Sequence, residues 1–214
     1  MHLAEIWRYP IKSMAGERLD RVTVGPLGLE GDRVVHVENA RGRVVTSRTH
    51  PLLLGHKGTL AADGEPLVDG RAWSDPGVRA EMERIVGAGA RLVRDDSAKR
   101  FDVLPLLVAT DGAIVAFGYD GRRLRPNLII GGVNGLDERT WEGRRLRIGT
   151  VTLRLEKLRA RCVMTTFDPD TLEQDRGVLA SIVERFDGTL ALNAAVEDGG
   201  IVRVGDAVTL PLPV

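Results

Sequence analysis

Apolar and polar residues alternate along short runs in the first half of the chain. This alternation is typical of β-strands with one buried face, and it predicts strands at residues 19–24, 33–37 and 43–46. The four residues between the last two strands, 39–42, have the composition of a hairpin turn. We therefore expect a β-rich N-terminal region with antiparallel pairing.

A spacing of three to four residues between apolar positions predicts two helices. The first covers residues 76–86, with Asp75 placed to cap its first turn and Gly87 to end it. The second covers residues 178–186. A shorter helical turn is expected after Thr110, whose hydroxyl can cap it.

Strand patterns also dominate the second half of the chain. They predict a last strand at residues 207–210 and earlier short strands around Leu106, Leu128, Leu146, Val151 and Val163. The polar residues 95–99 indicate a connector, so we expect one unit at residues 1–97 and a second at residues 98–214. The predicted fold class is therefore α+β and mainly β.

The composition is that of an ordinary globular protein without a strong overall electric field. Apolar residues make up 43% of the 214 residues, and 30 basic residues balance 30 acidic ones. A formal net charge of zero gives no long-range attraction to nucleic acid or to an anionic membrane, so any anion site must be local. The absence of signal-peptide and membrane-span patterns, together with a lone cysteine, predicts a cytoplasmic location.

Cys162 is the only cysteine in the chain. A lone thiol excludes an internal disulfide and a protein-bound iron–sulfur cluster, which needs about four thiolates, so electrons for any redox reaction must come from elsewhere. The flanking Arg159 and Arg161 should favour the thiolate, which is a soft metal ligand or a nucleophile. The alternative is a small buried apolar side chain. The pattern around Cys162 predicts a strand that runs into a turn.

Basic residues in three short motifs are suited to bind an oxyanion. Lys12 and Ser13 follow a strand end stiffened by Pro10. Arg33 opens one predicted strand and Arg48 follows its hairpin partner, so their guanidinium groups can converge on one anion across the ladder. The alternative is a pair of solvated cross-strand arginines.

The motif Arg125-Pro126-Asn127 combines a guanidinium fork, a fixed φ and a primary amide. These groups suit the donor and acceptor edge of a planar heterocycle such as a pterin. The alternative is a turn that leads into a buried strand at residues 128–130.

The segment 139–161 carries eight basic residues and two acidic ones. This excess indicates the solvated faces of strands. Alternatives are a docking surface for an acidic electron-transfer partner and an anion funnel towards Cys162.

Other common sites find no support in the sequence. The four histidines show no metal-binding spacing, and neither a phosphate-binding loop of the Walker type nor a dinucleotide fingerprint is present. Asp168, Asp170 and Asp175 lack the central glycine and terminal glutamate of a calcium loop, so we interpret them as turn and cap residues.

Several motifs, taken in order, resemble those of the molybdenum cofactor sulfurase C-terminal (MOSC) family: Tyr9-Pro10-Ile11-Lys12-Ser13, Gly31-Asp32-Arg33, Thr46-Ser47-Arg48, Arg125-Pro126-Asn127, Arg161-Cys162-Val163-Met164-Thr165-Thr166 with Asp168-Pro169-Asp170-Thr171, and Val204-Gly205-Asp206. The resemblance covers nearly the whole chain. It is closest to the branch that includes the mitochondrial amidoxime-reducing component and its bacterial relatives. It implies a β-rich N-terminal domain packed on a β-barrel-like MOSC domain with a few short helices.

The resemblance also implies a molybdenum cofactor, in which the dithiolene of a molybdopterin binds the metal and Cys162 is the protein ligand. Lys12, Ser13 and Arg33 would hold its terminal phosphate.

By the same resemblance, Arg125 and Asn127 would hold the pterin. Asp102 matches an acidic residue near the metal, where it would orient a substrate N-hydroxyl or relay a proton. Arg48 is added from the hairpin geometry alone. Val103 and Leu104 stand where those relatives carry two hydroxyl residues.

Our leading hypothesis is a reductase of N-hydroxylated compounds, such as hydroxylamines, amidoximes and N-hydroxylated bases, that removes their oxygen atom. Its electrons would come from a separate reductase or a ferredoxin-type protein, and no nucleic-acid or membrane partner is expected. One alternative is a carrier that delivers molybdenum cofactor, or sulfur held as a persulfide on Cys162. Another is a structural β-rich module with an empty pocket.

Overall fold

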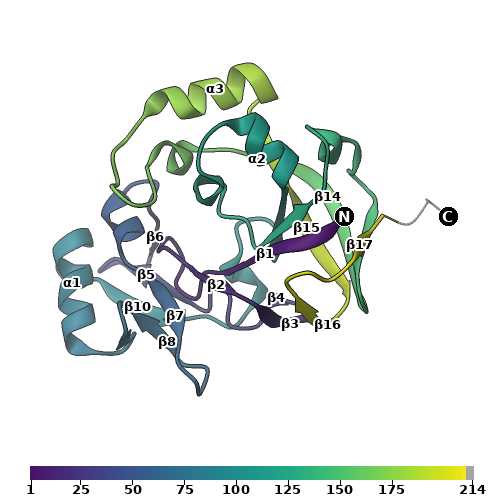
Figure 1. Cartoon of the computed structure of the whole chain (residues 1–214). Coiled ribbons are helices and arrows are strands. Elements are labelled where there is room, and N and C mark those ends of the chain that lie inside the picture. Colours follow the sequence, from purple (N-terminus) through teal and green to yellow (C-terminus); the bar gives the residue numbers. More distant parts are fainter. Residues whose placement is uncertain (211–214) are drawn as a thin grey trace.

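A computed structural model describes residues 1–210, which form one eight-stranded sheet flanked by three-stranded sheets (Figure 1). Neighbouring strands of the large sheet follow the order β17-β13-β14-β15-β11-β12-β1-β2. Its strands are β1 (His2–Arg8), β2 (Glu17–Leu19), β11 (Leu106–Thr110), β12 (Leu128–Gly131), β13 (Arg145–Ile148), β14 (Val151–Ala160), β15 (Thr189–Asp198) and β17 (Val208–Thr209). The β11–β12 pair is parallel, and the other pairs are antiparallel.

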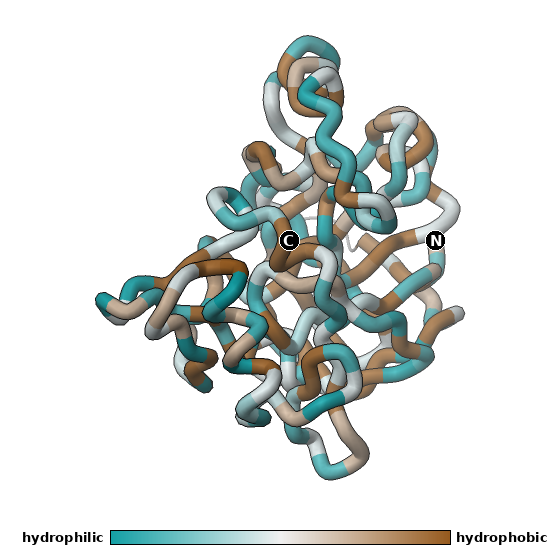
Figure 2. Tube along the Cα trace, turned by 90° about the vertical axis from the view of Figure 1, so that its left-hand side faces the viewer, coloured by the Kyte–Doolittle hydropathy of each residue, from teal (hydrophilic) through white to brown (hydrophobic). Residues whose placement is uncertain are grey.

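The small sheets each contain three short antiparallel strands. Their members are β16 (Gly200–Arg203), β3 (Arg21–Gly25) and β4 (Gly28–Leu29); β10 (Arg91–Arg94), β5 (Val35–Glu38) and β6 (Val44–Val45); and β7 (Gly58–Leu60), β8 (Pro66–Val68) and β9 (Arg71–Ala72). Figure 2 shows hydrophobic and hydrophilic residues interspersed along the whole trace.

The large sheet curls back on itself. An isolated bridge joins His2 to Ala207, the N–H of Leu3 donates to the C=O of Asp206 at 2.9 Å, and the N–H of Gly205 donates to the C=O of Leu3 at 2.8 Å. The first strand is thereby tied to the segment just before β17, at the other end of the strand order. The strand ladder does not close fully, but one apolar cluster fills the interior. The predicted class, α+β and mainly β with a barrel-like domain, is confirmed.

Helices cover the outside of the sheets. The described residues contain α1 (Pro76–Val86), α2 (Asp111–Phe117) and α3 (Arg176–Phe186), and the 3-10 turns η1 (Pro51–Gly55), η2 (Ala98–Arg100), η3 (Gly121–Leu124), η4 (Asp137–Thr140) and η5 (Val163–Thr166). α1 packs beside β10 at the left of Figure 1, and α2 and α3 share an apolar cluster at its top. Within residues 1–210, no helix combines the length and the apolar character needed to cross a membrane.

Both predicted helix caps are present. The carboxylate of Asp75 accepts hydrogen bonds from the N–H groups of Gly77 and Val78 at 2.7 and 3.2 Å. The hydroxyl of Thr110 accepts from the N–H of Ala113 at 3.1 Å. Each cap satisfies helix N–H groups that have no partner within the helix.

The core of the large sheet draws on both halves of the chain. Leu3 and Ile6 from β1 pack in one cluster with Leu128 from β12 and Leu192 from β15. A second apolar core joins α1 to β5 and β10 within the N-terminal half. The division near residue 97 stays a prediction, and the large sheet contains strands from both sides of it.

The N-terminal strand predictions need two corrections. The predicted strand 19–24 is broken, because β2 ends at Leu19 and β3 begins at Arg21. Arg33 lies outside β5 with a φ of 56°, because its backbone N–H donates to the C=O of Tyr9 at 2.8 Å and not to a neighbouring strand of that sheet. Its guanidinium pairs with the buried carboxylate of Asp32. Arg33 and Arg48 therefore do not meet across the β5–β6 ladder, in which Val37 pairs with Val45.

The strand predicted around Val163 is wrong, because these residues form the 3-10 turn η5. The hydroxyl groups of Thr165 and Thr166 donate back to the C=O groups of Cys162 and Val163 at 2.8 and 2.7 Å. Such local side-chain bonds satisfy the backbone without a neighbouring strand. Cys162 therefore lies at the start of a helical turn, two residues after β14.

Candidate functional site

All the site residues predicted from the sequence line one cavity of about 420 Å³: Lys12, Ser13, Arg33, Arg48, Asp102, Arg125, Asn127 and Cys162. All eight lie in loops and turns, and both halves of the chain contribute them. Cys162 is partly exposed, so its thiol is accessible from the cavity and is not a sealed core residue.

Positive side chains dominate the walls of this cavity. The cationic residues are Lys12, Arg33, Arg48, Arg123, Arg125, Lys157, Arg159 and Arg161. Among residues 1–210, Asp102 is the only acidic residue on these walls. Because the whole chain carries no net charge, this is a local positive field that attracts anions.

Three residues on the cavity wall have strained backbones. Ser13, Arg33 and Arg125 have φ angles of 71°, 56° and 55°. This left-handed region costs roughly 1–2 kcal/mol for a residue with a side chain. Strain of this kind is common at functional sites, where the surrounding structure imposes it.

Asp102 connects three of the cations. Its Oδ1 lies 2.7 Å from Nζ of Lys12, and its Oδ2 lies 2.5 and 3.6 Å from Nη2 of Arg48 and Arg159. Partial burial alone would raise the pKa of Asp102, but hydrogen bonds and charge from Lys12 and Arg48 outweigh it and lower the pKa to about 2. The carboxylate is therefore ionised at neutral pH and accepts hydrogen bonds.

Arg48 lines the cavity together with Cys162 and Asp102. Burial alone would lower the pKa of Arg48, but the interactions with Cys162 and Asp102 outweigh it and raise the pKa. The guanidinium is therefore held in its charged form beside the carboxylate of Asp102. Arg48 is the residue for which the sequence offered the least support.

Asn127 is fully buried and its amide is used by the protein itself. Its Oδ1 accepts from the N–H of Leu107 at 3.1 Å and from Arg33 at 3.3 Å. Its Nδ2 donates to the C=O of Trp7 and to Oδ2 of Asp32, both at 3.2 Å. The amide therefore holds together the strand ends and the Asp32–Arg33 pair behind the cavity wall.

Arg125 and Arg161 have buried donor atoms without partners. The guanidinium of Arg125 lies 4.3 Å from the ring centroid of Tyr9, and Nη2 of Arg125 has no hydrogen bond. Arg161 donates through Nη2 to the C=O of Leu124 at 2.6 Å, and its Nε has no hydrogen bond. Burial lowers the pKa of each arginine to about 10. Within residues 1–210, no carboxylate pairs with either, so both have capacity to bind an acceptor-rich ligand.

Apolar side chains also line the cavity. Phe101, Val103 and Leu104 are among them, and Val103 is 58% exposed. Their side chains can contact an apolar part of a ligand, but they donate no hydrogen bonds.

The sequence analysis did not identify Arg123 and Asp32 as site residues. Arg123 stands between Arg122 and the Arg125 motif, and no spacing distinguishes it from its neighbours. Asp32 was named only as a member of the motif Gly31-Asp32-Arg33, without a role of its own. Asp32 is fully buried and accepts from the N–H of Tyr9 at 2.7 Å, as well as from Arg33 and Asn127. A buried carboxylate cannot be distinguished from an exposed one in a polar turn by sequence alone.

Fold and site together define a β-rich protein with a cavity lined by cationic side chains and one accessible thiol. Residues 1–96 match the family model of the MOSC N-terminal beta barrel domain, and residues 114–209 match that of the MOSC domain. The chain belongs to the MOSC family.

Among curated relatives, the chain is similar to mitochondrial amidoxime reducing component 2 of Macaca fascicularis and of Homo sapiens. Each is 25% identical, over 96% of this chain and 82% of the relative. Component 1 of Homo sapiens is 24% identical over 79% of this chain and 67% of its own length. Among solved structures, the YUAD protein from Bacillus subtilis has a similar fold, with a TM-score of 0.52 and 13% identity over 97% of this chain and 93% of that protein.

Proposed function

We propose that this protein is a molybdenum-cofactor-dependent reductase of N-hydroxylated compounds. The observation that carries the proposal is the single accessible thiol, Cys162, on the wall of a cavity lined by eight cationic side chains. Membership of the MOSC family and the similarity to amidoxime reducing components support it.

The side chains of the cavity fit an anionic cofactor with a pterin ring. Lys12, Ser13 and Arg33 would hold the phosphate, and Arg125 offers the ring a buried donor that has no partner. Cys162 would be the soft ligand of the metal. Within residues 1–210, no group of three or more His, Cys, Asp or Glu residues could hold a metal by itself, so the remaining ligands would come from the cofactor.

When bound, the cofactor would supply a soft metal centre that exchanges two electrons. Reduction of a hydroxylamine, R–NHOH, to the amine and water consumes two electrons and two protons. The ionised Asp102 would accept a hydrogen bond from the substrate N–OH group and orient it. Because its pKa is about 2, Asp102 is not the source of these protons at neutral pH, and of its two expected roles we propose orientation.

The electrons would come from a separate reductase or a ferredoxin-type protein, since one cysteine cannot bind an iron–sulfur cluster. The substrate is proposed to be a small molecule, such as a hydroxylamine, an amidoxime or an N-hydroxylated base. The cytoplasmic location remains a prediction, because the curated relatives are named as mitochondrial proteins.

The test is to make the chain in a host that synthesises the cofactor and to compare it with Cys162→Ala. Bound molybdenum and the fluorescence of the acid-released oxidised pterin report loading, and reduction of an amidoxime with an artificial electron donor reports activity. We expect about one molybdenum per wild-type chain and the loss of both metal and activity in the variant. A Cys162→Ala protein that keeps both contradicts the proposal.

The second candidate is a carrier of molybdenum cofactor or sulfur. The observation that favours it is the partial exposure of Cys162, which makes the sulfur accessible to another protein. A persulfide on Cys162 of the purified protein, without turnover of N-hydroxylated compounds, would establish this function in place of the first.

A further inference from the structure

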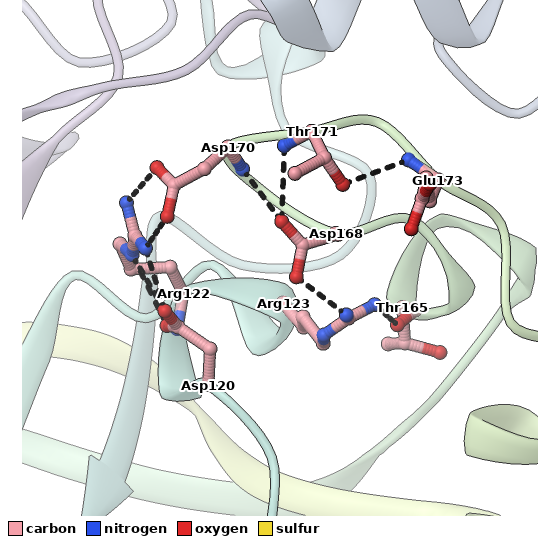
Figure 3. A network of polar contacts seen from close by, with 8 residues as sticks. All are labelled: Asp120, Arg122, Arg123, Thr165, Asp168, Asp170, Thr171 and Glu173. Atoms are coloured by element: carbon pink, nitrogen blue, oxygen red, sulfur yellow. Dashed lines mark hydrogen bonds and ion pairs between the residues drawn. The ribbon is translucent and has the colours of Figure 1, made fainter.

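We propose that Asp168 is a positioning residue for Cys162, and that it acts through Arg123. The side chains concerned lie in one polar network between the turn η3 and the segment that follows Cys162 (Figure 3). The consequence of this inference for catalysis rests on the proposed function. The effect of Asp168 on the position of the Cys162 thiol does not.

Arg123 connects this network to the cavity. Its Nη2 donates to Oδ2 of Asp168 at 2.9 Å, and its Nη1 donates to the C=O of Thr165 at 3.3 Å. The side chain of Arg123 is only 9% exposed, so its charge needs a partner inside the protein. Asp168 is the carboxylate that provides it.

Thr165 connects Arg123 to Cys162 through hydrogen bonds. The N–H and the hydroxyl of Thr165 both donate to the C=O of Cys162, at 3.0 and 2.8 Å. Asp168, Arg123, Thr165 and Cys162 are therefore joined by consecutive hydrogen bonds. A shift of Arg123 is transmitted to the turn that carries the thiol.

Asp168 is itself held rigidly. Its Oδ1 accepts hydrogen bonds from the N–H groups of Asp170 and Thr171, both at 3.0 Å. The bonds from Thr171 and Asp170 and the charge of Arg123 lower the pKa of Asp168, which keeps the carboxylate ionised. A fixed anion of this kind defines where the guanidinium of Arg123 can lie.

Arg123 also belongs to the arginine-rich wall of the cavity. It lies two residues before Arg125 and lines the same cavity. Without Asp168, the guanidinium of Arg123 would be free to turn towards an anion in the cavity and to release Thr165. Because Asp168 holds Arg123, this arginine supports the turn that carries the thiol. The other arginines of the cavity wall remain available to a ligand.

A neighbouring ion pair provides a matched control. Arg122 pairs with Asp170 through two contacts, at 2.9 and 2.6 Å, and also with Asp120 (Figure 3). The Arg122 and Asp170 side chains are 37% and 68% exposed. Among the described residues, these two side chains bond to each other and to Asp120 and make no bond to Arg123, Thr165 or Cys162, although the backbone N–H of Asp170 donates to Asp168. Asp170→Asn thus removes the same charge from the same turn without removing the partner of Arg123.

The experiment measures the rate at which iodoacetamide, a neutral reagent, alkylates Cys162 in the cofactor-free full chain. Because the chain has one cysteine, the rate reports this thiol alone. We expect Asp168→Asn to change the rate by about fivefold or more, and Asp170→Asn to stay within about twofold of wild type. Asp168→Glu, which restores the charge, should recover most of the change. Molybdenum content after production in a cofactor-synthesising host should fall in Asp168→Asn alone.

Arg123→Lys is the second variant, and it decides the question if Asp168→Asn does not fold. A lysine keeps the charge but cannot bond to Asp168 and Thr165 together through a planar fork, so the alkylation rate should again change. Wild-type rates in Arg123→Lys, or in a folded Asp168→Asn, overturn the inference whatever the protein catalyses. If the variants change the alkylation rate of Cys162 but the wild-type protein does not reduce N-hydroxylated compounds, the inference about Asp168 is upheld and only the proposed function is contradicted.

Discussion

At the scale of single residues, the site depends on side chains whose hydrogen bonds stabilise the fold itself, independently of any ligand. The amide of Asn127 uses its two N–H groups and its oxygen within the structure. It bonds to both members of the Asp32–Arg33 pair and so supports the position of Arg33, a predicted anion ligand. Loss of this amide should therefore affect folding first and ligand binding as a consequence.

Asn127→Ala should lower the free energy of unfolding by about 3 kcal/mol, because buried groups that lose a partner cost about 1–3 kcal/mol each. Asn127→Asp should be at least as harmful, since it places a second carboxylate beside Oδ2 of Asp32, 3.2 Å from the present amide nitrogen. Denaturant unfolding monitored by circular dichroism checks both. A variant with wild-type stability but weaker cofactor binding would instead show a direct role in the site.

Glu138 gives a residue-scale prediction on pH. Its side chain is fully buried, Oε1 accepts from the N–H of Ala191 at 3.2 Å, and Oε2 has no hydrogen bond. Burial raises the pKa of Glu138 above its ordinary value, so the folded state binds this proton more tightly than the unfolded state. Stability should therefore fall as pH rises from the ordinary pKa through the raised one.

Glu138→Gln removes this titration and should make the protein more stable than wild type at pH 8, with a smaller difference at pH 4. Urea unfolding at several pH values measures the two curves. Parallel curves for wild type and variant would mean that Glu138 has the same pKa in the folded and unfolded states, and would contradict the prediction.

Most of the residues predicted for the site could be found from their types and their order along the sequence. Positive charge, and the preference of a thiolate for soft metals, are properties of single side chains. Lys12, Arg33, Arg125 and Cys162 were identified in this way, and all four line the cavity. The network behind them was not predictable, because its members meet only in the folded chain. The contact of Arg123 with Asp168, for example, joins residues 45 positions apart.

At the scale of elements, local signals identified the helices well and the short strands less well. Asp75, Pro76 and Gly87 mark both ends of α1 within the chain itself, and the structure has this helix at the predicted residues. The strand error at Val163 has the opposite cause. A few β-branched residues favour a strand, but the hydroxyl groups of Thr165 and Thr166 can also bond to the preceding turn, and only the tertiary structure decides.

Asp75→Ala should lower the free energy of unfolding by about 1 kcal/mol, the usual cost of losing an N-cap. For a chain of this size, that corresponds to a fall of about 2–4 °C in Tm. Asp20→Ala is the control, because Asp20 is exposed and its side chain makes no hydrogen bond among residues 1–210. Differential scanning calorimetry should separate the two variants, and equal Tm values would show that the cap does not contribute.

At the scale of the whole molecule, the two sequence units are joined through their strands. β1 pairs with β12, and β3 pairs with β16, so strands near the N-terminus pair with strands from the second half of the sequence. The cavity follows the same plan, since Lys12 and Arg33 come from one unit and Arg125 and Cys162 from the other. Folding and assembly of the site should therefore be coupled.

Fragments 1–97 and 98–214, produced separately, should each lack the near-ultraviolet circular dichroism of a packed protein, because each leaves strands and an apolar core without partners. Mixed or co-produced, they should associate and regain it. A well-folded isolated fragment 98–214 would show that the second unit is an independent domain.

The left-handed backbones of Ser13, Arg33 and Arg125 affect any attempt to engineer this protein. Glycine adopts that conformation without strain, so glycine at position 13 would relieve it while removing one hydroxyl group from the cavity. Glycine at position 33 would also leave the buried carboxylate of Asp32 without its ion pair, and that cost opposes the relief of strain. A selection for heat resistance alone would therefore tend to remove the Ser13 hydroxyl and keep Arg33. Libraries built for robustness should keep codon 13 fixed, or the most durable clones will be those with a weaker anion site.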